Sequence, residues 1–343
     1  MDPLLKKIIN AAGVSGYEGE ITKIMHDEFK KITKEVEIDN FGNVIAHKGK
    51  GSKKIMIAAH MDEIGLLVKY ITKDGYLNFI KIGGIDDRVL VGQRVVVKSK
   101  KGDVCGVIGM KPPHLVREEE RKNPIKYTDM FIDIGAKSKE DAEKRVSIAD
   151  SIIFEPNAGV LSGNLIYGKA IDDRVGCFAL LKILERLKVN AQVYAVSTVQ
   201  EEVGLKGART SSFKINPDFA IALDTTSAGD TPMIKENESN LRLSAGACIT
   251  VIEASGRGII VSEKIKNLFI DTAKANKIKY QLDVLEGGMT DGAMINMNRE
   301  GIPTGVLSVA SRYAHSPTGV FSMDDLNSVI DLAVKAIENF VKK

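Results

Sequence analysis

The alternation of short apolar runs with helix-like segments constrains the fold of this chain more than any other feature. Two segments with helically spaced apolar residues begin near Leu4 and Ile21, and a hairpin pattern and the apolar run 55–59 follow them. From a helix expected near Asp172, strand-like runs and helices alternate up to a closing helix that begins near Asp324. Strands separated by helices predict an α/β fold with a mixed sheet flanked by helices.

Residues 67–162 interrupt this alternation. Short strand-like runs, such as 130–135 and 149–157, are separated there by turn residues. We therefore expect residues 1–66 and 163–343 to form one domain, and residues 67–162 to form a small all-β domain inserted in it. Within the insert, the charged run 117–122 is expected to be an exposed loop.

The charge balance excludes several classes of partner. Lys and Arg total 48 and Asp and Glu total 45. The resulting formal charge of +3 is too small to attract nucleic acid or an anionic membrane strongly. No apolar run is long enough to span a bilayer, and the first residues lack the pattern of a signal peptide. Three separate cysteines with no CxxC pair are typical of a reducing compartment, so we expect a cytoplasmic protein with neither nucleic-acid nor membrane partners.

Acidic residues and histidines follow the apolar runs at the points where strands should end. In open α/β sheets, ligands bind beyond the carboxyl ends of the strands, so these side chains should meet at one edge. Each of these residues alone is weak evidence for a functional site, because an Asp or Glu pair usually caps a helix. Together they are stronger evidence, since buried carboxylates repel one another unless cations neutralise them. The residues in question are His60, Asp62, Asp172, Asp173, Glu201, Glu202, Asp224 and His315.

The residue types indicate which metal would bind. Two imidazoles with several carboxylates and no thiolate favour Zn²⁺ or Co²⁺, with Mn²⁺ as an alternative, and are too rich in nitrogen for a dedicated Ca²⁺ site. There are too many acids for one tetrahedral ion, so two ions about 3.5–4 Å apart, bridged by one carboxylate, are expected. Of the adjacent Glu201 and Glu202, one would bind metal and the other would act as a base. The expected ligands are His60, Asp172, Glu202, Asp224 and His315.

Five motifs carry a resemblance to a known family. AHMDEIG at 59–65, GKAIDDRVG at 168–176, STVQEEVGLKGA at 197–208, ALDTT at 222–226 and RYAHSP at 312–317 resemble, in order over nearly the full chain, the motifs of the tetrahedral di-metal aminopeptidases. These zinc-exopeptidase-type enzymes are also called deblocking or glutamyl aminopeptidases, or cellulase-like endoglucanases. The resemblance implies a peptidase domain interrupted by a β-rich domain for dimerisation, and dimers that assemble into a dodecamer.

The resemblance also implies a role for each site residue. His60 and Asp224 would hold one ion, Glu202 and His315 would hold the other, and Asp172 would bridge them. Glu201 would be the general base and Asp62 would orient the His60 imidazole, whereas Asp173 would not be a ligand. The implied reaction is hydrolysis of the N-terminal peptide bond of short peptides by a water that two metals activate and Glu201 deprotonates.

Two departures from the family pattern affect the expected substrate pocket. Met289 and Gly292 stand where the family has a Gly-Thr-Asp-Ala sequence, and Thr318-Gly319 follow the His-Ser-Pro triplet where an acid is common. Neither touches an expected ligand. The sequence therefore leaves the preferred N-terminal residue open among acidic, basic and aliphatic ones.

Two other functions remain as alternatives. An endo-1,4-β-glucanase-like glycosidase would need an aromatic-lined groove, but Trp is absent and aromatic residues make up 6% of the chain. A non-catalytic assembly protein that retains a hydrolase fold would be expected to lack a ligand or the base, and the chain retains all of them.

Overall fold

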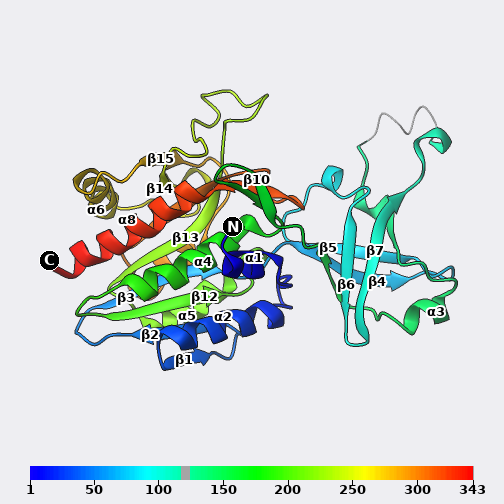
Figure 1. Cartoon of the computed structure of the whole chain (residues 1–343), viewed down its shortest axis with the longest axis horizontal. Coiled ribbons are helices and arrows are strands. Elements are labelled where there is room, and N and C mark those ends of the chain that lie inside the picture. The colour runs from blue at the N-terminus through cyan, green and yellow to red at the C-terminus, as the bar shows by residue number, and fades with distance from the viewer. Residues whose placement is uncertain (117–123, 343) are drawn as a thin grey trace.

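The computed structural model describes residues 1–116 and 124–342, so the loop expected at 117–122 lies outside the described residues. Figure 1 shows an elongated molecule in which a layered α/β part contains both termini and a smaller β part projects from it. The expected mixed α/β fold, with helices flanking a sheet, is confirmed. Among the described residues, no helix has the length and apolar character required to cross a membrane.

The α/β part is built on a sheet of eleven strands in the described part of the chain. β12, β3, β13 and β16 are parallel and central, whereas β2 and β17 pair antiparallel at either side of them. β14 (Ala247–Ile252) pairs with β16, and β15 (Tyr280–Val284) pairs with β14. The other strands are, in sheet order, β1 (Glu35–Ile38), β2 (Val44–Lys48), β12 (Gln192–Thr198), β3 (Lys54–His60), β13 (Phe219–Ser227), β16 (Thr304–Arg312), β17 (Gly319–Ser322), β11 (Leu165–Gly168) and β10 (Gly159–Ser162).

Helices cover both faces of this sheet. One face carries α4 and α8, against which α1, α2 and α6 pack, and the other face carries α5 and α7. The apolar run of β3 explains why both faces are covered, because Ile55 and Ile57 enter the core on one side and Met56 enters the core on the other. The helices are α1 (Pro3–Asn10), α2 (Gly19–Ile32), α4 (Ile171–Arg186), α5 (Lys206–Ile215), α6 (Glu263–Ala275), α7 (Asp291–Asn296) and α8 (Met323–Lys342).

Sequence reasoning missed four elements of this part, namely α5, β10, β14 and β17. α5 lacks a clear apolar stripe because it buries mainly small residues, among them Gly207, Ala208 and Ser212. β14 is largely buried, as the central strands of the sheet are, but it pairs antiparallel with β16, an arrangement that a simple alternation of strands and helices does not predict.

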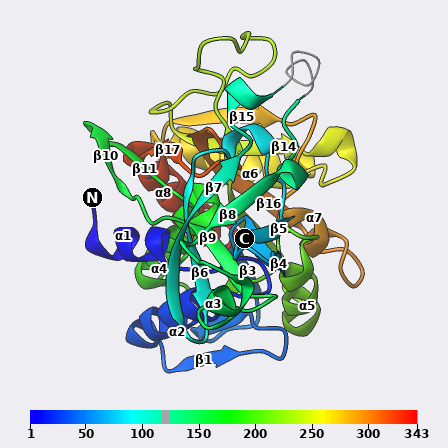
Figure 2. The ribbon, with the colours of Figure 1, turned by 90° about the vertical axis from the view of Figure 1, so that its right-hand side faces the viewer.

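The projecting part is a closed barrel with its own apolar core. Figure 2 views the molecule from the barrel side. The barrel begins at Gly65 and its last strand ends at Phe154, whereas β10 at Gly159–Ser162 belongs to the large sheet, so the boundary expected at 162 lies beyond the barrel. In barrel order the strands are β4 (Gly65–Ile71), β5 (Leu77–Ile82), β8 (Met130–Asp133), β7 (Gly102–Met110), β6 (Arg94–Ser99) and β9 (Ser151–Phe154), and α3 (Lys139–Glu143) lies between β8 and β9 along the chain.

A buried ion cluster joins the two parts. Lys169 Nζ lies 2.7 Å from Glu63 Oε2, and Arg174 Nη2 lies 3.4 Å from Glu63 Oε1. Arg174 Nη1 also donates to the carbonyls of Ile8 (2.7 Å) and Ala11 (3.1 Å), so the cation satisfies groups at the end of α1. The cluster therefore fixes α1 and α4 to the segment that leads into the barrel.

Replacing Lys169 by Met should destabilise the fold, because it leaves part of the buried Glu63 charge uncompensated. We expect a loss of about 3 kcal/mol in the free energy of unfolding, measured by urea denaturation. Lys182→Met is the matched control, since the Lys182 side chain on α4 is partly exposed and lies 3.7 Å from the nearest carboxylate, that of Glu185, so the change in stability should be less than about 0.5 kcal/mol. Equal unfolding midpoints for the two variants would show that the cluster does not stabilise the fold.

Candidate active site

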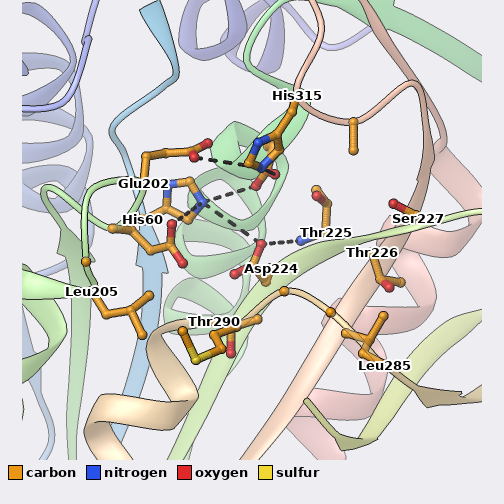
Figure 3. Close-up of a pocket in the computed structure, with 17 residues that line it drawn as sticks. His60, Glu202, Leu205, Asp224, Thr225, Thr226, Ser227, Leu285, Thr290 and His315 are labelled. Carbon is orange, nitrogen blue, oxygen red and sulfur yellow. Dashed lines mark hydrogen bonds and ion pairs between the residues drawn. The ribbon is translucent and has the colours of Figure 1, made fainter. Parts of the chain in front are cut away.

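The expected ligands meet in one cavity at the carboxyl ends of the parallel strands. The cavity has a volume of about 340 Å³ and is lined by all five of them together with Glu201 (Figure 3). His60 ends β3, Asp224 lies near the end of β13, and Asp172 begins α4. Glu201 and Glu202 follow β12, and His315 lies in the loop between β16 and β17. The sheet topology therefore brings together residues that are far apart in the sequence.

Asp172 lies between the two histidines. Its Oδ1 is 3.1 Å from His60 Nε2, and its Oδ2 is 3.5 Å from His315 Nε2. Beside Oδ1, His60 Nε2 lies 3.9 Å from Asp224 Oδ1. Beside Oδ2, His315 Nε2 lies 3.7 Å from Glu202 Oε2. The two carboxylate oxygens of Asp172 thus face two separate groups of possible ligand atoms.

Two groups of side chains in the described part of the chain have atoms close enough to share a metal ion. One consists of His60, Asp172 and Glu202, and the other of His60, Asp173 and Asp224. Asp173 has a separate structural role, because its Oδ1 accepts a hydrogen bond from the backbone N–H of Gly176 at 2.9 Å in the first turn of α4. A Cβ at Gly176 would lie 2.1 Å from Asp173 Oδ2, so this close approach requires glycine.

The electrostatics of the cavity favour bound cations. Burial raises the pKa of Glu201 and of Asp224 well above the usual range, and burial together with the charge of Asp172 raises the pKa of Glu202 to about 7. So many buried carboxyl groups cannot all be charged without a counter-charge. Divalent ions would supply it, and two imidazoles with carboxylates form a donor set that suits Zn²⁺, Co²⁺ or Mn²⁺.

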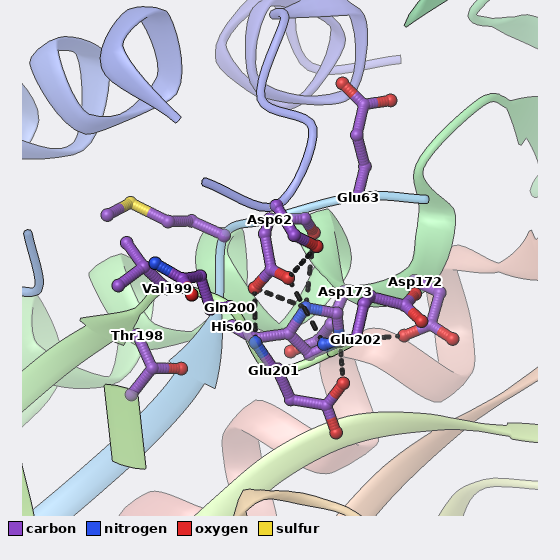
Figure 4. Close-up of polar contacts among 12 residues, drawn as sticks. His60, Asp62, Glu63, Asp172, Asp173, Thr198, Val199, Gln200, Glu201 and Glu202 are labelled. Carbon is purple, nitrogen blue, oxygen red and sulfur yellow. Dashed lines mark hydrogen bonds and ion pairs between the residues drawn. The ribbon is translucent and has the colours of Figure 1, made fainter. Parts of the chain in front are cut away.

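Asp62 is fully buried and holds three parts of the site together (Figure 4). Its backbone oxygen lies 3.2 Å from His60 Nδ1, and its Oδ1 lies 3.5 Å from the same nitrogen. Its carboxylate also accepts hydrogen bonds from the backbone N–H groups of Glu201 (2.9 Å) and Glu202 (3.2 Å) and from the Ser15 hydroxyl (2.6 Å). Although burial opposes this, the bonds from His60, Ser15 and Glu201 lower the pKa of Asp62. Asp62 therefore orients the imidazole and the glutamate loop together.

Sequence reasoning missed the contribution of the segment after β5. The Gly84 carbonyl lies 2.8 Å from His315 Nδ1, so an Nδ1–H donating to it leaves Nε2 free toward Asp172 and Glu202. A hydrogen bond to Asp172 raises the pKa of His315 to about 9, against the effect of burial. Gly84 has no polar side chain that could have marked it in the sequence.

Comparison with known proteins agrees with this geometry. The model of the M42 glutamyl aminopeptidase family matches residues 42–332. The lysyl aminopeptidase of Pyrococcus furiosus is 37% identical over 98% of this chain and 96% of its own length. The chain therefore belongs to the M42 glutamyl aminopeptidase family, as the resemblance of its motifs indicated, and it is a hydrolase of the aminopeptidase class.

Solved structures extend the likeness to the whole chain. A TET aminopeptidase from a marine sediment Thaumarchaeota archaeon superposes with a TM-score of 0.94 at 38% identity, covering 98% of this chain and 95% of that one. The TET1 peptidase of Pyrococcus horikoshii, described as assembling into a tetrahedron or a large octahedral shell, gives 0.87 at 36% identity and 98% coverage of both chains. A Thermotoga maritima protein described as an endoglucanase gives 0.80 at 33% identity, covering 98% and 97%.

Replacing Gly84 by Val should weaken metal binding at the His315 side. A Cβ at this position would lie 3.0 Å from His315 Nδ1, so the ring must move away from its carbonyl partner. We expect the affinity for a divalent ion to fall about tenfold, measured by competition with a chromogenic chelator.

The matched control is Gly19→Val, because a Cβ at Gly19 would meet no atom within 4 Å. Unchanged metal affinity in Gly84→Val would contradict the role given to the Gly84 carbonyl.

Proposed function

We propose that the cavity binds two divalent metal ions and removes N-terminal residues from short peptides. His60 and Asp224 would hold one ion, Glu202 and His315 would hold the other, and Asp172 would contribute to both. The observation that carries the proposal is the position of Asp172, whose Oδ1 faces His60 and whose Oδ2 faces His315. Zn²⁺ or Co²⁺ suits this donor set best, with Mn²⁺ as an alternative.

Glu201 is proposed as the general base. It lines the cavity, is 8% exposed, and belongs to neither of the two groups that could share a metal ion in the described residues. Its Oε2 lies 3.9 Å from His60 Nε2, so it is close to the metal ligands while its oxygens remain available for proton transfer. The bond from its backbone N–H to Asp62 fixes the start of its side chain.

The reaction then follows from the positions of these groups. Bound divalent ions would polarise the scissile carbonyl and make the attacking water more acidic. Glu201 accepts the proton of that water on a carboxylate oxygen while the water oxygen forms a bond to the carbonyl carbon. As the carbon–nitrogen bond breaks, Glu201 returns the proton to the leaving nitrogen. The positive α-amino group of the substrate is attracted by the carboxylates that line the cavity, which favours cleavage at a free N-terminus.

We further propose that the inserted barrel, from β4 to β9, forms dimers, and that the dimers assemble into a dodecamer. The support is the TET1 peptidase of Pyrococcus horikoshii, described as assembling into a tetrahedron or a large octahedral shell, together with exposed apolar side chains on the barrel, such as Tyr70 (51% exposed) and Val107 (47%). A cytoplasmic location is proposed as well, because all three cysteines are free of disulfides.

The glycosidase alternative has less support than the peptidase. No Phe or Tyr side chain is among the residues that line the cavity in the described part of the chain, whereas a sugar-binding groove relies on such side chains. The alternative of a non-catalytic assembly protein has no lost ligand or base to support it, since all six residues line the cavity.

Replacing Glu201 by Gln tests the assignment of the base. The amide cannot accept the proton, so we expect kcat for an aminoacyl p-nitroanilide to fall about a thousandfold while the metal content stays at two ions per chain. Glu185→Gln on the exposed surface of α4 is the control and should retain full activity. Near-normal turnover by Glu201→Gln would overturn the assignment.

The same assay separates the alternative functions. Treatment with EDTA should abolish release of N-terminal residues, and re-addition of Zn²⁺ or Co²⁺ should restore it. Hydrolysis of carboxymethylcellulose that persists in EDTA would favour the glycosidase, and absence of both activities in metal-loaded protein would favour the assembly protein.

Static light scattering tests the proposed assembly. The expected mass is about twelve times that of the 37.3 kDa chain. A monomeric mass at micromolar concentration would contradict the role proposed for the insert.

A further inference from the structure

One wall of the cavity is uncharged. Apart from the proposed metal ligands and Glu201, the residues that line the cavity in the described part of the chain carry no charge. They come from the end of β13, from the loop between β15 and α7, from the loop before α5 and, for Ala314, from the loop between β16 and β17 (Figure 3). Their larger side chains are those of Leu205, Thr225, Thr226, Leu285, Met289 and Thr290.

Four hydroxyl side chains line the cavity, those of Thr225, Thr226, Ser227 and Thr290, and two of them donate to acids behind the wall. The Thr226 hydroxyl donates to Asp283 Oδ2 at 2.9 Å, and the Thr290 hydroxyl donates to Glu253 Oε1 at 2.6 Å. The Thr290 oxygen also accepts from the backbone N–H of Gly292 at 3.1 Å. The protons of both hydroxyls therefore point to buried carboxyl groups and are not available to a ligand.

These contacts disfavour charged substrate side chains. An acidic side chain would find no cation in the wall and would lie in front of the buried acids Asp283 and Glu253, which are 3% and 0% exposed. A basic side chain would find no carboxylate in the wall itself, because threonine hydroxyls separate it from those acids. Burying either charge without a partner costs binding free energy, whereas burying an apolar side chain carries no such cost.

Met289 provides the most accessible apolar surface of the wall. It is 48% exposed although it lines a concave site, and its side chain leans against Gly258, where a Cβ would lie 3.0 Å from Met289 Cγ. A large apolar side chain exposed inside a cavity with few polar contacts is typical of a surface that binds an apolar ligand.

We infer that this wall binds the side chain of the N-terminal substrate residue and selects uncharged apolar residues such as Leu and Met, with Met289 determining the specificity. The inference rests on the proposed function, because it places the scissile bond at the carboxylate and histidine cluster. It extends that function by naming the substrate class, which the motifs of the sequence leave open.

The experiment compares kcat/KM for Leu-, Lys- and Glu-p-nitroanilide in the metal-loaded protein and in Met289→Lys. We expect the wild type to prefer Leu over both charged residues by at least about tenfold. The new cation in Met289→Lys should lower kcat/KM for Leu about tenfold and raise it for Glu by a similar factor, mainly through KM. Met297→Lys is the matched control, since Met297 is 62% exposed at the end of α7 and does not line the cavity.

Each outcome of this comparison decides the inference. A wild-type preference for Lys or Glu, or the same Leu-to-Glu ratio in Met289→Lys as in Met297→Lys, would overturn it while leaving the aminopeptidase function intact. Failure of the wild type to release any N-terminal residue would instead overturn the proposed function and the inference with it.

Discussion

The crowding of buried carboxylates at the carboxyl ends of the parallel strands is the constraint on which the rest of the structure depends. Asp172, Glu201, Glu202 and Asp224 line one cavity beside His60, and burial raises the pKa of all these acids except Asp172, whose pKa the two neighbouring histidines lower against that effect. Such a group of acids is unfavourable without counter-charge, and the proposed pair of divalent ions supplies it. In the same arrangement Glu201, the proposed base, lies beside the proposed ligands.

The surroundings of the cavity hold these residues from several directions. Asp62 links the end of β3 to the loop that carries both glutamates, and Gly84 links the barrel to His315. Lys169 and Glu63 join the start of α4 to the segment that enters the barrel. The barrel is therefore more than a candidate surface for assembly, because a backbone carbonyl next to it positions an expected metal ligand.

Much of the fold and most of the site could be predicted from the sequence, because buried parallel strands appear as apolar runs and the residues that follow them meet at one edge. The contribution of Gly84 could not be predicted, since a backbone carbonyl leaves no trace in the residue type. The neutral wall around Met289 was equally hidden, because it combines loops that only the folded chain brings together. The sequence also does not indicate that Ala170, Gln200 and His315 adopt φ values of 49°, 55° and 55°. Such positive φ values are strained for residues other than glycine, and the surrounding contacts hold them.

Anomalous diffraction from crystals grown with Zn²⁺ or Co²⁺ tests the proposed two-metal site without relying on activity, because it locates the ions themselves. Two peaks are expected in each chain, about 3.5–4 Å apart, one near His60 and Asp224 and the other near Glu202 and His315, with one oxygen of Asp172 directed at each. A single peak, or two peaks that do not share Asp172, would contradict the proposed site.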